Sequence, residues 1–315
     1  MHRRLAALVV LTALAASLAS FAAFHWFLEL FSHYALHYIA LALVAAGLLA
    51  ALRSWRWAAA ALAVACATAF TIVQNMPLVR QPEAAKHPAQ ITLFHFNAGF
   101  RHNNPREVTD YILAHADRFD VVVLIESTLA WVEELKRLEG VFAHAVRAPD
   151  ASPFGVAVLS KIKPAMAEII SPPNGYRHIE MRLVLPAYPR PLTIYAIHPP
   201  PPPVSRELAH ARNDKLRYIS GIVRGRPDES AVVVGDFNVT PFSPHFASFA
   251  RTSGLQPVQK AILPRATWPV VLGIAWFGIA IDHSFVAPDL AIVSREVGPA
   301  LGSDHLPVTL TLAPK

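Results

Sequence analysis

Residues 232–244 read VVVGDFNVTPFSP, and this stretch decides the fold. A continuous apolar run bounded by turn residues predicts a buried strand of an α/β sheet. The run delivers Asp236 and Asn238 into a turn, where Pro241 and Pro244 prevent the strand from continuing. Open α/β sheets bind ligands beyond the carboxyl ends of their strands, which makes the two side chains candidate site residues. The alternative is that they only cap the turn through hydrogen bonds to the backbone.

Polar residues also follow the other predicted strands. A single His or Asn in such a place is usually a structural residue with satisfied hydrogen bonds. A whole series of Asp, Asn, Glu and His after core strands predicts one shared cleft if the strands are neighbours. The further members of the series are Asn97, Glu126, His198, Asp282, Asp304 and His305.

The fold class follows from the alternation of β-rich runs with helical patterns after residue 90. So many strands with only four helices predict an α/β, four-layer sandwich: two packed mixed β-sheets flanked by helices, rather than one doubly wound sheet. The predicted strands are 90–96, 120–126, 154–160, 179–185, 191–197, 230–236, 283–287, 290–294 and 306–312. The predicted helices are 105–117, 128–139, 205–224 and 243–252.

The types of the candidate residues restrict the chemistry. Carboxylates without cysteine ligands suit a hard cation bound through oxygen, most simply Mg²⁺ or Mn²⁺. Zinc is less expected, because it would want His or Cys clustered at close spacing. A His near an acid supplies a general base or acid. Adjacent strand residues point to opposite faces, so Asp282 rather than Asp304 is the expected partner of His305.

Long apolar stretches precede the α/β pattern, and each could cross a bilayer as a helix. They cover residues 5–24, 34–52 and 58–76. The expected organisation is a three-helix transmembrane anchor (1–77), a Pro-rich linker (78–90) and a catalytic domain (91–315). The first stretch also fits a cleaved signal peptide, because MHRR is a basic start and small residues follow.

The arginines next to these stretches predict the orientation. Arg3 and Arg4 precede the first stretch, and Arg53 and Arg56 lie between the second and third. The positive-inside rule then places the N-terminus in the cytoplasm and the chain after residue 77 outside. The expected location is the cell membrane, multi-pass, with the catalytic domain on the extracytoplasmic side.

The charge balance bears on partners. Of 28 basic and 22 acidic residues, five arginines and one glutamate lie in residues 1–80, which leaves 23 and 21 for the remainder, a net charge of +2. A nearly neutral domain does not favour nucleic acid, which is bound through Lys and Arg. The single cysteine, Cys66, lies in an apolar stretch, so the outer domain uses no disulfides.

An ordered series of motifs resembles the endonuclease/exonuclease/phosphatase superfamily. The resemblance covers about residues 90–312, and the combination of GDFN with a terminal SDH is highly specific. It implies a four-layer α/β sandwich that cleaves a phosphate ester by attack of water. Ile125 stands where the superfamily often has Gln, so the surroundings of Glu126 depart from the pattern. The series is Asn97, Glu126, GVAVLS (155–160), His198, GDFN (235–238), IDH (281–283) and SDH (303–305).

The resemblance also implies roles around the metal and the nucleophile. Glu126 would bind the metal, with Asn97 and Asp304 near it, and Asn97 would also contact the substrate. Asp236 and Asn238 would position the nucleophile and the scissile phosphate.

The histidines have implied roles as well. His305, held by Asp282, would be the base or would stabilise the transition state. His198 would stabilise the charge of the phosphate.

An uncharged segment before IDH bears on the substrate. Residues 267–280 read TWPVVLGIAWFGIA and have no charged side chain. One interpretation is a buried strand or hairpin of the core. The other is an apolar lip beside the site, where Trp268 and Trp276 contact lipid at a membrane interface. The layout resembles membrane-anchored members of the superfamily linked to glycopeptide resistance, which are thought to dephosphorylate undecaprenyl pyrophosphate.

The leading hypothesis is a metal-dependent phosphohydrolase that acts outside the membrane on a lipid-linked phosphate or pyrophosphate, with the lipid bilayer as partner. An extracytoplasmic nuclease is the alternative among enzymes. A catalytically silent, membrane-tethered binding module is the alternative from another class, and the intact set of acids and histidines argues against it.

Overall fold

The computed structural model describes residues 2–19, 21, 25–77, 88–100, 104–173, 175–259, 263–271, 275 and 277–315. The chain forms two compact units. The N-terminal unit contains residues 1–77, 202–210 and 239–248, and the α/β unit contains residues 78–201, 211–238 and 249–315. Most of the expected linker, 78–87, lies outside the described residues.

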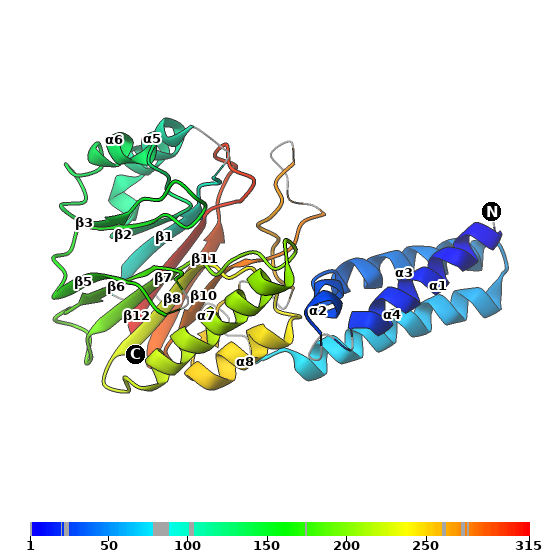
Figure 1. Cartoon of the computed structure of the whole chain (residues 1–315). Coiled ribbons are helices and arrows are strands. Elements are labelled where there is room, and N and C mark those ends of the chain that lie inside the picture. Colours follow the sequence, from blue (N-terminus) through cyan, green and yellow to red (C-terminus); the bar gives the residue numbers. More distant parts are fainter. Residues whose placement is uncertain are drawn as a thin grey trace. The chain divides into compact units, whose positions relative to one another are not determined.

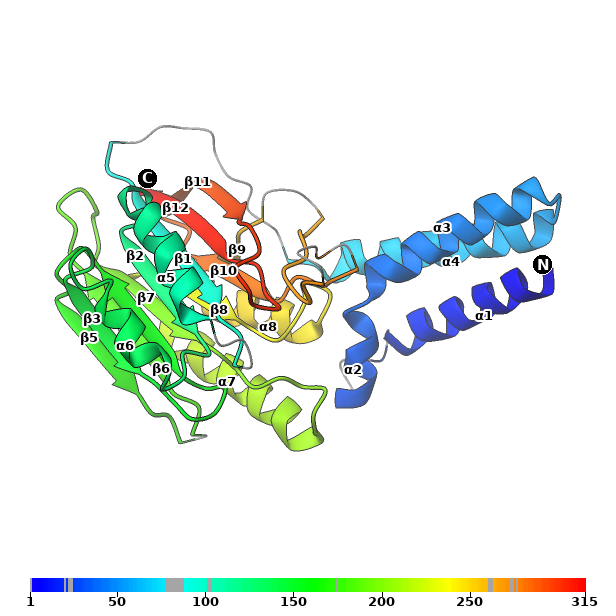
Figure 2. The ribbon, with the colours of Figure 1, turned by 90° about the horizontal axis from the view of Figure 1, so that it is seen from above.

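The N-terminal unit corrects the expectation of three membrane-spanning helices. Among the described residues, one helix, Trp55–Gln74, is long and apolar enough to span a membrane by itself. A bent pair of helices that meet at 52° adds a second span if the pair is counted as one (Figure 2). The first apolar helix, Arg4–Ala19, is shorter. Hydropathy does not show how long each helix is: the helix of the second stretch, Ala35–Ala51, has 17 residues and qualifies only together with the helix before it. The helices are α1 (His2–Ala19), α2 (Trp26–Ser32), α3 (Ala35–Ala51) and α4 (Trp55–Asn75).

The first sheet of the α/β unit has six strands in the order β11-β12-β1-β2-β4-β3. Only β1 and β2 pair in parallel there, and the other neighbours are antiparallel. The VVVLI run of β2 is buried at every position, as expected for a central strand. The strands are β1 (Ile91–Asn97), β2 (Val121–Ile125), β3 (His144–Ala148), β4 (Val156–Ser160), β11 (Leu290–Val297) and β12 (Val308–Pro314).

The second sheet also has six strands, in the order β5-β6-β7-β8-β10-β9. Its one parallel pair is β7 with β8. The two sheets are therefore both mixed, and Figure 1 shows them packed as layers, which confirms the predicted class. The strands are β5 (Met166–Ile170), β6 (His178–Leu183), β7 (Leu192–Ile197), β8 (Ser230–Asp236), β9 (Gln256–Pro257) and β10 (Asp282–Val286).

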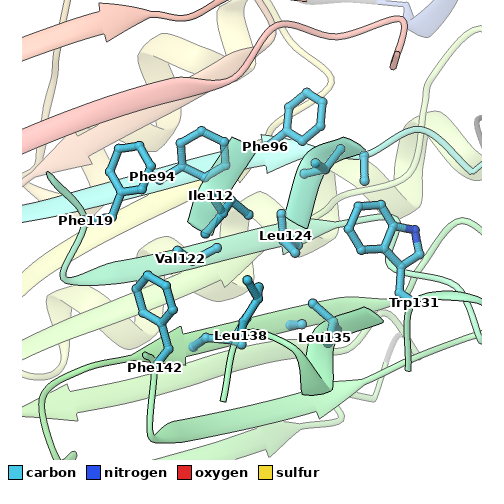
Figure 3. Close-up of a cluster of buried hydrophobic side chains, with 14 of the residues drawn as sticks. Phe94, Phe96, Ile112, Phe119, Val122, Leu124, Trp131, Leu135, Leu138 and Phe142 are labelled. Carbon is cyan, nitrogen blue, oxygen red and sulfur yellow. The ribbon is translucent and has the colours of Figure 1, made fainter. Parts of the chain in front are cut away.

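Helices cover the outer faces of the sheets (Figure 1). The amide of Glu107 donates to the Asn104 side chain, and Pro105 follows this cap, which explains where α5 begins. The apolar face of α5 contributes Ile112 to a core cluster that contains Phe94 and Val122 (Figure 3). The helices are α5 (Pro105–Ala114), η1 (Ala116–Arg118), α6 (Trp131–Lys136), α7 (Arg206–Arg224) and α8 (Pro244–Ser253).

Three strands were missed by the sequence prediction: β3, β5 and β9. Each lies at the edge of its sheet. An edge strand is paired on one side only, and β3 and β5 keep half-buried or exposed residues at most positions. Their sequences therefore lack the continuous apolar run that identified the central strands.

Candidate active site

The register of the strands brings the predicted residues to one edge of each sheet. In the first sheet, Asn97 is the last residue of β1 and pairs with Ile125, directly before Glu126. In the second sheet, Asp236 ends β8 and pairs with Asp282, which begins β10. The convergence expected from the strand ends is therefore confirmed.

The loop before β12 reaches the same place. The Ser303 hydroxyl donates to the backbone carbonyl of Asn97 at 2.8 Å, and the amide of His305 donates to the Ser303 hydroxyl at 3.1 Å. Ser303 thus ties His305 to the end of β1. His198 joins the group because Ile197, the residue before it, pairs with Gly235 in the neighbouring strand.

Asn97 lies between two carboxylates. Its Nδ2 donates to Glu126 Oε1 at 3.1 Å and to Asp236 Oδ2 at 3.0 Å, while Oδ1 accepts from the Gly99 amide at 3.0 Å. Glu126 has a φ of 60°, a left-handed conformation that is uncommon for a residue with a side chain. Its Oε2 accepts from the backbone amide of Phe100. Ile125 precedes Glu126 in this chain, and a backbone donor from the loop after β1 supports the Glu126 carboxylate.

His305 and Asp282 form a buried pair. His305 Nδ1 lies 2.8 Å from Asp282 Oδ2, and Nε2 lies 3.8 Å from Asp236 Oδ2. Asp282 is thus the partner of His305, as predicted. Burial opposes the charged imidazolium, but the charge and hydrogen bond of Asp282 outweigh it and raise the pKa of His305 to about 10. Burial also opposes the charged form of Asp282 and would raise its pKa, but the charge and hydrogen bond of His305 outweigh burial and lower the pKa of Asp282.

Asp236 is both a turn residue and part of the cluster. Its Oδ1 accepts from the Asn238 amide at 2.8 Å, and its Oδ2 faces Asn97. Burial, and next the negative charge of Asp282, raise the pKa of Asp236 to about 8. Without a cation, the cluster therefore has more carboxylates than positive charge can balance.

Asn238 has a left-handed backbone with a φ of 51°. Its side-chain Nδ2 donates to the Pro199 carbonyl at 2.9 Å. Its own carbonyl accepts from the guanidinium of Arg212, a fully buried residue of α7, at 2.8 Å. Sequence reasoning missed Arg212, because a lone arginine in an amphipathic helix is normally a solvent-exposed residue.

His198 faces two of the carboxylates of the cluster, those of Glu126 and Asp236. Its Nδ1 lies 3.0 Å from the Pro153 carbonyl, which can only accept, so Nδ1 is the protonated nitrogen. Its Nε2 lies 3.6 Å from Glu126 Oε1 and 3.7 Å from Asp236 Oδ2. Burial lowers the pKa of His198, although the charge of Glu126 acts in the opposite direction.

Asp304 contacts Trp268. The indole Nε1 of Trp268 donates to Asp304 Oδ2 at 2.9 Å, and the Trp268 ring lies 6.3 Å from the His305 ring between centroids. Among the hydrogen bonds of the described residues, Asp304 makes none to Glu126 or Asn97, although it is adjacent in sequence to His305. Trp276 lies outside the described residues.

Two groups of side chains could hold a cation. The oxygen and nitrogen atoms of Asp236, Asp282 and His305 lie within 4.8 Å of one another. However, His305 Nδ1 already bonds Asp282 Oδ2 at 2.8 Å, so two of these three groups are engaged with each other. The carboxylates of Glu126 and Asp236 around Asn97 instead offer oxygen donors, which fit a hard cation.

Solved structures share this fold at low sequence identity. D. rerio TDP2, crystallised with a single-strand DNA product, is 17% identical with a TM-score of 0.57, over 71% of this chain and 99% of that one. An endonuclease/exonuclease/phosphatase from Beutenbergia cavernae is 19% identical with a TM-score of 0.53, over 72% of each chain. SmcL is 16% identical with a TM-score of 0.53, over 72% of this chain and 100% of that one. No significant match was found among curated proteins.

The family assignment rests on the sequence itself. Residues 94–305, which make up most of the α/β unit, match the Endonuclease/Exonuclease/phosphatase family. Enzymes of this family are hydrolases of phosphoester bonds and are typically dependent on a divalent metal. The match includes every residue of the cluster around Asn97, Asp236 and His305. This chain therefore belongs to the Endonuclease/Exonuclease/phosphatase family and is a hydrolase acting on ester bonds.

Proposed function

We propose that the chain hydrolyses a lipid-linked phosphate or pyrophosphate at the extracytoplasmic face of the cell membrane. The main support is the apolar segment 267–280, whose residue Trp268 contacts the site. Trp268, at that base, donates to Asp304 and lies beside His305. A lipid substrate needs an apolar contact next to the reacting phosphate. The apolar segment would supply this contact, and the cluster beside Trp268 would bind the phosphate.

Among its described residues, the apolar segment is closed at its base and exposed at Val271 and Phe277. The amides of Thr267 and Trp268 both donate to the Ile279 carbonyl, at 3.0 and 3.1 Å, which closes the base. Toward the tip, Val271 is 64% exposed and Phe277 is 86% exposed. Core packing therefore accounts for the base of the segment, and contact with lipid accounts for the exposed Val271 and Phe277.

The proposed cofactor is Mg²⁺ or Mn²⁺. Glu126 would hold the ion through its carboxylate. Asn97, whose Oδ1 also accepts from the Gly99 amide, and Asp304, beside Trp268, stay candidate ligands. When bound, the ion would neutralise phosphate charge and orient the scissile group. Asp236 is placed to accept the proton of the attacking water, because its Oδ2 faces the centre of the cluster. Asp282 fixes the His305 ring so that Nε2 is free to donate to a phosphate oxygen.

The membrane location is supported by charge and hydropathy. Arg53 and Arg56 flank the start of the apolar helix Trp55–Gln74. The positive-inside rule keeps this end in the cytoplasm, so the chain after residue 77 emerges outside. The proposal resembles the membrane-anchored members of the family that are thought to dephosphorylate undecaprenyl pyrophosphate.

Shortening Phe277 to serine is expected to raise KM for a long-chain polyprenyl pyrophosphate by about tenfold, with no comparable change for a water-soluble short-chain analogue. The reason is that burying an apolar side chain contributes roughly 1.5–3 kcal/mol, and only the long chain loses this contact. The measurement is steady-state hydrolysis in mixed micelles with Mg²⁺, alongside the melting temperature.

Val184→Ser is the matched control, because Val184 is 63% exposed elsewhere in the α/β unit. Equal losses on both substrates would contradict the lipid contact, and faster cleavage of single-stranded DNA would favour the nuclease alternative. A reporter fused after Lys315 tests the topology: activity in the cytoplasm would overturn the proposed location.

Replacing Glu126 with glutamine is expected to raise the Mg²⁺ concentration that gives half-maximal activity by at least about tenfold, with partial recovery at high Mg²⁺. An amide keeps the shape of the side chain and removes the charge that attracts a hard cation. A Mg²⁺ titration of turnover on the short-chain analogue measures this. Glu168→Gln, an exposed position on β5, is the control, and an unchanged midpoint for Glu126→Gln would exclude Glu126 as a ligand.

A further inference from the structure

Glu29 is an unusual residue for its surroundings. It is the only acidic residue among residues 1–77, and its side chain is completely buried within the N-terminal unit. A buried carboxylate costs several kcal/mol unless hydrogen bonds or charges compensate. The Ser243 hydroxyl donates to Glu29 Oε1 at 2.6 Å, and His245 Nε2 lies 3.9 Å from Oε2. The compensation therefore comes from a segment more than two hundred residues away in the sequence.

His33, one helical turn after Glu29, contacts the same segment. Its Nδ1 lies 3.0 Å from Thr240 Oγ1 and accepts from the Thr240 amide at 3.4 Å. Because Nδ1 accepts, the proton belongs on Nε2, which lies 3.8 Å from Glu29 Oε1. The Glu29 carboxylate thus also faces the ring of His33.

The held segment is a short turn with both ends fixed. The Ser243 amide donates to the Thr240 carbonyl at 3.0 Å, which closes the turn TPFS. His33 holds the first residue of the turn and Glu29 holds the last. The Ser243 hydroxyl also accepts from the His245 amide at 3.2 Å and so caps the start of α8.

The turn TPFS begins two residues after Asn238, the last residue of the GDFN turn that bears Asp236. Asp236 and Asn238 belong to GDFN, and only Val239, which is buried, separates Asn238 from Thr240. We propose that Glu29 and His33 are positioning residues for hydrolysis, because they fix the chain that leaves Asn238. Asn238 has a left-handed backbone, which is uncommon for a residue with a side chain, and a fixed chain on its C-terminal side helps to hold this conformation. The N-terminal helices would then be a working part of the enzyme and more than a tether.

Hydrogen–deuterium exchange on the full chain in detergent tests the inference independently of substrate. In Glu29→Ala, the amides of Phe237 and Asn238 are expected to exchange about tenfold faster, because loss of the fixed turn lets the catalytic turn open locally. Glu29→Gln should restore most of the protection, since its amide oxygen still accepts from Ser243. Ser32→Ala is the control: this buried residue of α2 bonds only its own helix, at the Glu29 carbonyl, among the hydrogen bonds given by the described residues.

A kinetic arm rests on the proposed function and uses the short-chain pyrophosphate with Mg²⁺. Glu29→Ala is expected to lower kcat by about tenfold with KM nearly unchanged, because misplaced catalytic groups affect the transition state more than substrate binding. If Glu29→Ala does not fold, Ser243→Ala with Ser243→Thr as the conservative variant replaces it in both arms. Faster exchange confined to residues 243–248, a uniform rise over β1 and β2, or an equal effect of Ser32→Ala would overturn the inference. If the wild type did not turn over the pyrophosphate, the proposed substrate would be wrong. The hydrogen–deuterium exchange result would then decide by itself whether Glu29 positions the GDFN turn.

Discussion

Asp236→Asn is expected to lower kcat by about 10² to 10⁴ while leaving the melting temperature unchanged or higher. The loss follows because the amide cannot accept a proton from water, and positioned acid–base groups typically contribute this much. Folding should not suffer, because the amide oxygen can still accept from the Asn238 amide and the side chain keeps its size and shape. Steady-state kinetics and thermal unfolding of the same preparations measure both quantities.

The pH dependence of stability gives a second signature of the same substitution. Burial raises the pKa of Asp236 to about 8 in the folded chain, above its unfolded value, so the folded state binds the extra proton between about pH 4 and pH 8. The stability of the wild type should therefore fall as pH rises through this window, relative to Asp236→Asn. The comparison is made with a chelator present, since a bound cation would favour the carboxylate.

Asp289→Asn is the matched control for both measurements. Asp289 accepts from the Ser230 hydroxyl at 2.6 Å, at the opposite end of β10 from Asp282. Its substitution should leave kcat unchanged. If Asp236→Asn kept wild-type turnover, the assignment of the catalytic turn would be wrong.

The central strands and the polar residues at their ends were predictable because each is encoded locally. The run VVVGD forms β8 as expected, and Asp236 lies in the cluster with Asn97 and His305. The sequence offered two interpretations of Asp236, a turn cap or a site residue, and the structure combines them: one oxygen caps the turn and the other faces the site. A local sequence pattern could not decide between the two interpretations, because the two oxygens of one carboxylate can serve both roles at once.

Contacts between distant segments were not predictable from the sequence. The hydrogen bond from Trp268 to Asp304 and the one from Ser243 to Glu29 each depend on how the chain returns to itself. Helix α2 was also not predicted, because the expected apolar stretch begins at residue 34, after the bend, and α2 contains the charged Glu29. Edge strands such as β5 were missed for a related reason. Pairing with a neighbouring strand, here β6, makes them strands, and their own sequence pattern does not reveal this.

The glycine of GDFN carries the second large effect. Gly235 has a φ of 137°, and a Cβ added there would lie 2.1 Å from the backbone carbonyl oxygen of Ile197. Ile197 belongs to β7, which pairs in parallel with β8 at this residue, so the carbonyl cannot move without opening the sheet. Because His198 follows Ile197 and Asp236 follows Gly235, any such opening displaces two residues of the site together.

Gly235→Ala is therefore expected to lower the free energy of unfolding by about 3–5 kcal/mol, through backbone strain and the steric clash, which corresponds to a fall of roughly 10 °C in melting temperature. Gly221→Ala in α7 is the matched control, because an added Cβ there meets nothing within 4 Å beyond its chain neighbours and the backbone of its own helix. That variant should gain about 0.5–1 kcal/mol, since alanine favours a helix interior. Thermal unfolding of the two variants separates the effects of adding one methyl group at each glycine. A wild-type melting temperature for Gly235→Ala would mean that β7 can move away from β8 at no cost, and the close approach of the two strands would then not be what places His198 beside Asp236.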